Sequence, residues 1–335
     1  MGAPADRCAA LLADILAGPA ELAAVLRAQA AAIRDVPLGA LARPTWRMTG
    51  MGSSRFAAMD AAARLRAAGR DAAAEVASAA GGSPGGRDVL VLAISASGRT
   101  PEVIDAAQRH HGSSFVLGLT ARPDAPLVEH ADATIPLGAA RIEASGIATL
   151  TYRATVAALA ALGDDGPGDL LDRRLATAVP ALQALVDGRD WWLDRAATIL
   201  DAGRPVHVLA DGARLGAAEQ AALMLREAAR IPATAYETGE WLHVGLYTML
   251  PGDPVLLLAG SLADDESVAT IRRRGGVIVS VGPAGPASDV HVALPAAALM
   301  DPLVRALVEP AAAKLLAQEL WRRASATEVA PPTPA

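Results

Sequence analysis

Short apolar runs alternate with longer amphipathic or alanine-rich stretches along most of this 335-residue chain. The short runs predict strands, and the stretches between them predict helices. Alternation of this kind is typical of an α/β fold, in which a doubly wound parallel sheet has helices on both faces. The expected strands are residues 46–49, 72–77, 88–94, 114–119 and 133–137 in the first half, and 205–210, 232–236, 254–259, 276–281 and 289–293 in the second.

Alanine-rich stretches predict the longer helices. These are residues 6–35 with an interruption near Gly18-Pro19, 145–162, 169–202, and a closing helix at 299–323. Residues 163–168, Gly-Asp-Asp-Gly-Pro-Gly, disfavour both helix and strand and therefore predict a linker. We expect N-terminal helices at 1–40, a first α/β unit at 41–163, a second at 169–323 and a flexible tail at 324–335.

The loop after the third expected strand is rich in hydroxyl groups and leads directly into a helix. It carries Ser95, Ser97 and Thr100 around Gly98, and Pro101 follows. Thr100 suits the N-cap of that helix and Pro101 its first turn. Such a loop gathers backbone N–H groups, hydroxyl donors and the positive end of a helix dipole, so it predicts a phosphate site.

A second loop supports the same site. The first expected strand ends in Gly50-Met51-Gly52-Ser53-Ser54, which opens another helix. Neighbouring strands of a parallel sheet end at one edge, so Gly52, Ser53 and Ser54 could surround one dianion together with the residues of the first loop. The rival interpretation is a dinucleotide fingerprint, but Arg55 stands where its third glycine would be. We therefore expect no nicotinamide and no other cofactor.

The two halves form a degenerate repeat. Residues 89–103 align with 254–268 without a gap, but Leu262, Asp264 and Asp265 stand in the hydroxyl-bearing segment of the second half. Carboxylates there would repel a phosphate. We therefore expect one phosphate site per chain, in the first half.

Composition argues against several kinds of partner. The net charge of −6 gives no basic surplus for nucleic acid. Charges and helix breakers interrupt every long apolar stretch, and the N-terminus lacks the pattern of a secretory signal, so we expect neither a membrane span nor secretion. Cys8, the single cysteine, suits a cytoplasmic protein. Lys314 is the only lysine, and we expect it on the surface of the closing helix.

Other residues that could carry chemistry favour structural roles. His110 and His111 suit the negative end of a helix dipole, and we expect no metal because no third ligand has a useful spacing. Trp191 and Trp192 suit packing of an interdomain helix.

The Gly-Ser-Ser and Ser-x-Ser-Gly-x-Thr motifs of the first half resemble those of the sugar isomerase (SIS) domain family. In the second half, residues 221–227 and the segment Gly239-Glu240-Trp241-Leu242-His243 are similar to the isomerase part of the glucosamine-6-phosphate synthases. The resemblance implies two flavodoxin-like SIS units in tandem, a homodimer, and a phosphosugar bound by the first-half hydroxyls. It also implies that Glu227 moves a proton between C1 and C2, and that His243 assists ring opening.

The residues themselves fit that chemistry, since a carboxylate at a helix end beside an imidazole supplies an acid/base pair. The alternatives are a solvated helical charge for Glu227, and a core or turn histidine for His243. The chain also departs from the synthases: Met224 replaces a helix lysine, Ala148 replaces a serine, and no lysine follows Lys314.

We therefore expect an aldose–ketose isomerase or an amino-sugar-phosphate deaminase acting on a hexose or hexosamine 6-phosphate. Glutaminase activity is not expected, because the glutaminase half is missing and Cys8 lies in a helix. A phosphosugar sensor without catalysis is the alternative, and a structural role with adventitious phosphate is a third.

Overall fold

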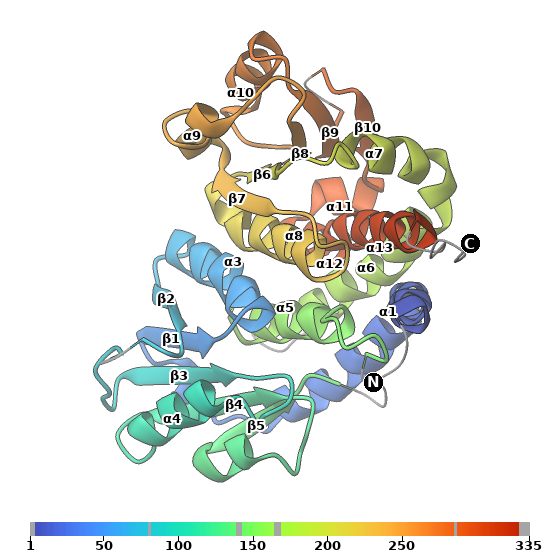
Figure 1. The fold of residues 1–335 in the computed structure, drawn as a ribbon. Coiled ribbons are helices and arrows are strands. Elements are labelled where there is room, and N and C mark those ends of the chain that lie inside the picture. The colour runs from blue at the N-terminus through green and yellow to red at the C-terminus, as the bar shows by residue number, and fades with distance from the viewer. Residues whose placement is uncertain (1–3, 80–81, 139–142, 164–168, 285–286, 328–335) are drawn as a thin grey trace, which may run out of the picture.

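The computed structural model describes residues 4–79, 82–138, 143–163, 169–284 and 287–327. They form two five-stranded parallel sheets, ordered β2-β1-β3-β4-β5 and β10-β9-β8-β6-β7 (Figure 1). In each sheet the first strand in sequence lies between the second and the third, so the two halves share one topology. This confirms the predicted doubly wound α/β architecture. Most of the predicted linker at 163–168 and most of the predicted tail lie outside the described residues.

The strands follow the predicted apolar runs closely. In β3 and β8 nearly every side chain is buried, as expected where helices cover both faces of a parallel sheet. The strands are β1 (Thr45–Gly50), β2 (Asp71–Val76), β3 (Val89–Ile94), β4 (Phe115–Thr120), β5 (Ala133–Pro136), β6 (Val206–Ala210), β7 (Ala233–Glu237), β8 (Pro254–Leu258), β9 (Val277–Gly282) and β10 (Val290–Ala293).

Helices cover both faces of each sheet and fill the space between the sheets. The α-helices are α1 (Pro4–Arg34), α2 (Leu38–Leu41), α3 (Ser53–Ala67), α4 (Pro101–His110), α5 (Leu150–Gly163), α6 (Asp169–Asp187), α7 (Leu193–Leu200), α8 (Leu215–Glu227), α9 (Thr238–Trp241), α10 (Asp264–Arg273), α11 (Ala296–Met300), α12 (Pro302–Val308) and α13 (Pro310–Thr327). The 3₁₀ helices are η1 (Pro126–His130), η2 (Gly188–Trp191), η3 (Gly212–Arg214) and η4 (Gly245–Thr248).

Helix α1 is continuous, so the predicted interruption at Gly18-Pro19 is wrong. Pro19 lacks one N–H donor, but Leu11, Ile15 and Leu22 on both sides of it are buried in the core, and packing outweighs the lost hydrogen bond. By length and composition alone, Asp6–Arg34 is apolar enough to cross a membrane. In this structure the helix packs against α5, α6 and α13.

Prolines and a 3₁₀ turn divide two predicted helices. The stretch predicted at 169–202 contains α6, η2 and α7, and the closing stretch at 299–323 falls within α11, α12 and α13. Pro302 and Pro310 are the first residues of α12 and α13, a position that proline favours. The two prolines therefore mark these helix boundaries in the sequence.

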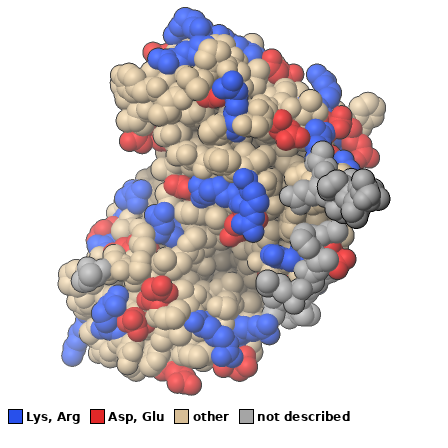
Figure 2. Space-filling model, viewed as in Figure 1, with Lys and Arg blue, Asp and Glu red and all other residues tan. Residues whose placement is uncertain are grey.

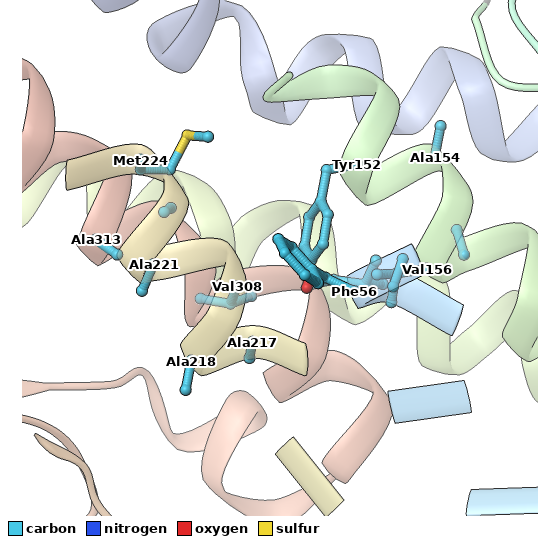
Figure 3. Close-up of a cluster of buried hydrophobic side chains, with 14 of the residues drawn as sticks. Phe56, Tyr152, Ala154, Val156, Ala217, Ala218, Ala221, Met224, Val308 and Ala313 are labelled. Carbon is cyan, nitrogen blue, oxygen red and sulfur yellow. The ribbon is translucent and has the colours of Figure 1, made fainter. Parts of the chain in front are cut away.

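Small side chains allow helices of the two halves to pack closely (Figure 3). Phe56 of α3 and Tyr152 of α5 lie near Ala217 and Ala221 of α8 in one buried cluster. Met224 of α8 is also buried in this cluster. The core is therefore continuous between the halves.

A buried carboxyl group lies where α3 and α8 meet. Asp60 is 4% exposed, and its Oδ1 accepts a hydrogen bond of 2.7 Å from the Gly216 N–H. Burial raises the pKa of Asp60 to about 7, although the Gly216 hydrogen bond and Arg64 lower it. The protonated form of Asp60 therefore predominates in the folded protein below neutral pH.

This raised pKa predicts that stability falls as pH rises. The stabilising contribution is complete below the unfolded pKa of 3.8 and is lost as pH rises through about 7. Between pH 5 and pH 8, the free energy of unfolding should fall by about 2–3 kcal/mol more in the wild type than in Asp60→Asn, which keeps the acceptor without the charge. Urea unfolding at both pH values measures this. Equal pH dependence in the two proteins would contradict it.

Candidate functional site

The two predicted hydroxyl-bearing loops begin side by side. In the first sheet, Gly50 at the end of β1 is in register with Ile94 at the end of β3. These strands flank the point where the strand order reverses, which is where ligands bind in sheets of this order. The loops also open α3 and α4, so two helix N-termini lie at this edge.

The β1–α3 loop depends on its glycines. Gly52 has a φ of +50° and open space beside the position of a Cβ. At Gly50 a Cβ would come within 2.9 Å of the Ser54 Cβ and 3.2 Å of the Ile94 carbonyl oxygen. Ser53 and Ser54 are the first residues of α3 and are partly exposed. The loop therefore presents serine hydroxyls beside an open space.

The β3–α4 loop joins its hydroxyl groups in a cluster. The Ser95 Oγ lies 2.9 Å from the Thr100 Oγ1 and 3.5 Å from the Ser97 Oγ. The Ser97 Oγ also accepts a hydrogen bond of 3.2 Å from the Arg99 N–H. Gly98 has a φ of +60°, and a Cβ there would overlap Ala125. Glycine thus allows the tight turn that brings the three hydroxyls together.

Thr100 occupies the predicted N-cap position, and Pro101 is the first residue of α4. The Thr100 hydroxyl makes no capping hydrogen bond, however, because it interacts with Ser95 instead. Its hydroxyl therefore belongs to the loop cluster. We call the seven loop residues predicted to bind phosphate the cradle: Gly52, Ser53, Ser54, Ser95, Ser97, Gly98 and Thr100.

In the second half, side chains of the protein interact with the loop that corresponds to the β3–α4 loop. Asp264 Oδ2 accepts hydrogen bonds from the Gly260 and Ser261 N–H groups at 2.5 and 3.0 Å. The Arg214 guanidinium donates to the Leu258 and Ala259 carbonyls and pairs with Glu309 at 3.0 Å. A carboxylate of the protein therefore accepts the hydrogen bonds of these loop N–H groups in the second half.

Glu227 is the last residue of α8. Its side chain is exposed at the surface, yet partial burial raises the pKa of its carboxyl group, while Arg226, Arg230 and Arg7 lower it. Helix α8 packs against α3, and Gln220 in its middle donates to the Ala148 carbonyl in the segment after β5.

His243 lies at the opposite end of β7 from Glu227. The α8 helix ends before β7 begins, whereas His243 is exposed in the turn after α9, beyond the end of β7 (Figure 1). The five residues of β7 alone span about 16 Å. Within one chain, the Glu227 carboxylate and the His243 imidazole therefore do not lie side by side.

The predicted surface role of Lys314 is also wrong. The side chain is fully buried, and its Nζ donates a hydrogen bond of 2.8 Å to the Thr149 carbonyl. Burial holds the pKa of Lys314 well below its usual range, and the neighbouring Arg153 lowers it further. The lysine therefore anchors the segment after β5 from inside the protein.

The remaining candidates take structural positions. Cys8 is buried beside Gln318, and burial raises the pKa of its thiol. His110 is buried, and burial lowers the pKa of its ring. Trp192 is buried, but Trp191 is 87% exposed and does not pack as predicted. Among the described residues, no group of three or more His, Cys, Asp and Glu is arranged to hold a metal ion.

Charges of both signs are interspersed on the face drawn in Figure 2. Blue arginines and red carboxylates alternate there across both halves and across the waist between them.

Comparison with known families and proteins identifies relatives of both halves. Residues 45–163 match the SIS domain family. The chain is 29% identical over 211 residues to a glutamine–fructose-6-phosphate aminotransferase (isomerizing) of Pyrobaculum aerophilum, a match that covers 59% of the chain and 35% of that protein. The chain thus spans about a third of the length of this relative.

Solved structures share the fold over nearly the whole chain. The C-terminal domain of glucosamine-fructose-6-phosphate aminotransferase from Francisella tularensis has a TM-score of 0.78 at 16% identity, over 93% of this chain and 95% of that one. Tagatose-6-phosphate ketose/aldose isomerase from Escherichia coli has a TM-score of 0.76 at 16% identity, and the match covers 94% of this chain and 93% of that one. Glucosamine-6-phosphate deaminase from Thermotoga maritima has a TM-score of 0.71 at 16% identity, and the match covers 94% of this chain and 95% of that one.

Proposed function

Because residues 45–163 are a SIS domain and the chain has the tandem SIS fold, we propose that this protein binds a hexose or hexosamine 6-phosphate in the cradle and moves a proton between C1 and C2 of that sugar. One observation carries the proposal. Two hydroxyl-bearing loops, each opening a helix, start in register on the adjacent strands β1 and β3. Hydroxyl donors and two helix N-termini together favour a phosphate dianion.

Glu227 is the base in this proposal. Its carboxylate removes the proton from C2 of the open-chain aldose, the C2 electron pair forms the C1=C2 double bond, and the aldehyde oxygen takes up a proton. The enediol then collapses to the ketose as the carboxyl group returns a proton to C1 and the C2 hydroxyl loses its own. A carboxyl pKa raised by partial burial suits both proton removal and proton return.

An amino group at C2 of the sugar would turn the same step into a deamination. The enolamine formed by proton transfer becomes an imine at C2, and water replaces the nitrogen to give the ketose and ammonia. The structural relatives support both candidate reactions, since they include a ketose/aldose isomerase and a deaminase. We propose a cytoplasmic location for this chemistry.

The placement of His243 favours a homodimer. Glu227 and His243 lie beyond opposite ends of β7, so we assign ring opening at each cradle to the imidazole of a second chain. Such sharing between copies requires a closed two-fold assembly. His243 is exposed, as this role requires.

Mixed dimers should therefore recover activity. Glu227→Gln and His243→Asn each inactivate the protein when expressed alone, below about 1% of wild-type turnover. When the two variants are co-expressed, about half of the dimers contain one of each, and each of these has one intact site, so turnover should return to about a quarter of the wild-type value. A mixture no more active than its components would contradict a shared site.

Proton NMR in deuterated water tests the proposed reaction. The protein is incubated with fructose 6-phosphate, glucose 6-phosphate and glucosamine 6-phosphate, and deuterium incorporation at C1 and C2 is followed. Exchange at either carbon supports proton transfer, and ammonia release selects the deaminase. Saturable binding without exchange of any of the three sugars would contradict catalysis.

A phosphosugar sensor is the second candidate. The lysines of the synthases are absent at the matching positions: Met224 is a core residue, and Lys314 is tied to the Thr149 carbonyl. The exposed position and raised pKa of Glu227 argue against a sensor without catalysis. Binding without exchange in the NMR experiment would support the sensor.

A further inference from the structure

The guanidinium of Arg153 in α5 is buried and makes no hydrogen bond with any of the described residues. The residue is 1% exposed, and its Nε and both terminal nitrogens lie away from solvent with no hydrogen-bond partner in the structure. The guanidinium lies directly against α1, where a Cβ at Gly18 would be 2.5 Å from the Arg153 Nη1. Burying an ionised group without a partner costs several kcal/mol, so something must balance this charge.

None of the nearby titratable groups forms a hydrogen bond with this guanidinium. Burial lowers the pKa of Arg153 to about 10, which leaves the side chain charged at neutral pH. Lys314 lies close enough for Arg153 to lower its pKa, and it supplies no negative charge. Glu143 is the neighbouring carboxylate and raises the pKa of Arg153, but its Oε1 accepts hydrogen bonds from the Thr149 N–H and from both the N–H and the hydroxyl of Thr151. Glu21 lies nearby, half-buried, without a hydrogen bond to the guanidinium.

Arg153 lines a small cavity between α1 and α5. Its volume is about 10 Å³, and its walls include Gly18, Glu21, Leu22, Leu137 and Ala154. A cavity of this size holds about one water-sized particle, so a phosphate or a sugar is too large. A neutral water molecule could satisfy N–H groups, but it could not balance the charge.

We propose that this cavity binds one small monovalent anion of the halide class, paired with the Arg153 guanidinium. The anion joins α1 to α5 by neutralising the cation that lies between them. This site is separate from the cradle and does not depend on the proposed function.

Thermal unfolding at constant ionic strength tests the site. Replacing sodium gluconate, whose anion is too large for the cavity, by sodium chloride should raise the Tm of the wild type by about 2–5 °C. The rise should disappear in Arg153→Met and persist in Arg122→Met, which removes an exposed arginine from the same half of the chain. Equal Tm values in the two salts for the wild type, or the same rise in Arg153→Met, would overturn the proposal.

Two further measurements test the anion site if Arg153→Met does not fold. Crystals of the wild type grown in bromide should show an anomalous peak within hydrogen-bonding distance of the Arg153 guanidinium, and its absence would count against the site. Glu21→Gln removes the one uncommitted carboxylate that lines the cavity. If Glu21 is the counter-ion, this variant loses stability in both salts while the wild type shows no chloride dependence, and the anion site is wrong.

Discussion

Replacing Glu227 with glutamine is expected to lower kcat by at least about a hundredfold while the Kd for the sugar phosphate stays unchanged. Glutamine keeps the size and polarity of the side chain but cannot accept and return a proton. In the wild type, the acid limb of the kcat profile should fall above the ordinary carboxyl range, because partial burial raises the pKa of Glu227. Steady-state kinetics and calorimetric titration measure both effects.

Glu219→Gln is the matched control for this prediction. Glu219 lies two turns earlier on α8, and the same charge is lost, so turnover should stay at the wild-type level. If Glu227→Gln retains full turnover, another residue is the base.

The second large effect is expected at the cradle. Ser97→Asp places a carboxylate within the hydroxyl cluster formed with Ser95 and Thr100, where it would face a phosphate dianion. Like-charge repulsion and the lost donor should weaken binding of fructose 6-phosphate by about a hundredfold or more. Calorimetric titration of the variant measures the change in Kd.

Leu262→Asp provides the matched control in the other half of the repeat. Leu262 holds the aligned loop position and is fully exposed, so a carboxylate there is tolerated and should leave sugar-phosphate binding unchanged. Equal loss of affinity in the two variants would mean that the effect comes from overall charge and not from the cradle.

Local features of the sequence predicted the strands and the glycine turns of the first half well. The run from Val89 to Ile94 is buried on both faces, and Gly98 has the positive φ that its turn requires. These outcomes depend on neighbouring residues, so periodicity and turn chemistry were enough to predict them. Where packing decided the result, as at Pro19 inside α1, the local signal failed.

Features that depend on distant segments were not predicted. Lys314 is buried because α13 packs against α1 and α8, although the apolar residues on both sides of the lysine were a usable signal. Glu227 and His243 are separated because β7 runs between them, and the number of residues between them in the sequence does not predict that distance. The contact of Arg214 with Glu309 joins residues far apart in the chain.

The most direct test of the central claim is a crystal structure of the protein with fructose 6-phosphate bound. The account predicts phosphate density within hydrogen-bonding distance of Ser95, Ser97 and Thr100, at the N-termini of α3 and α4. Phosphate bound instead at the loop of Asp264 in the second half, or an empty cradle at saturating sugar phosphate, would contradict it.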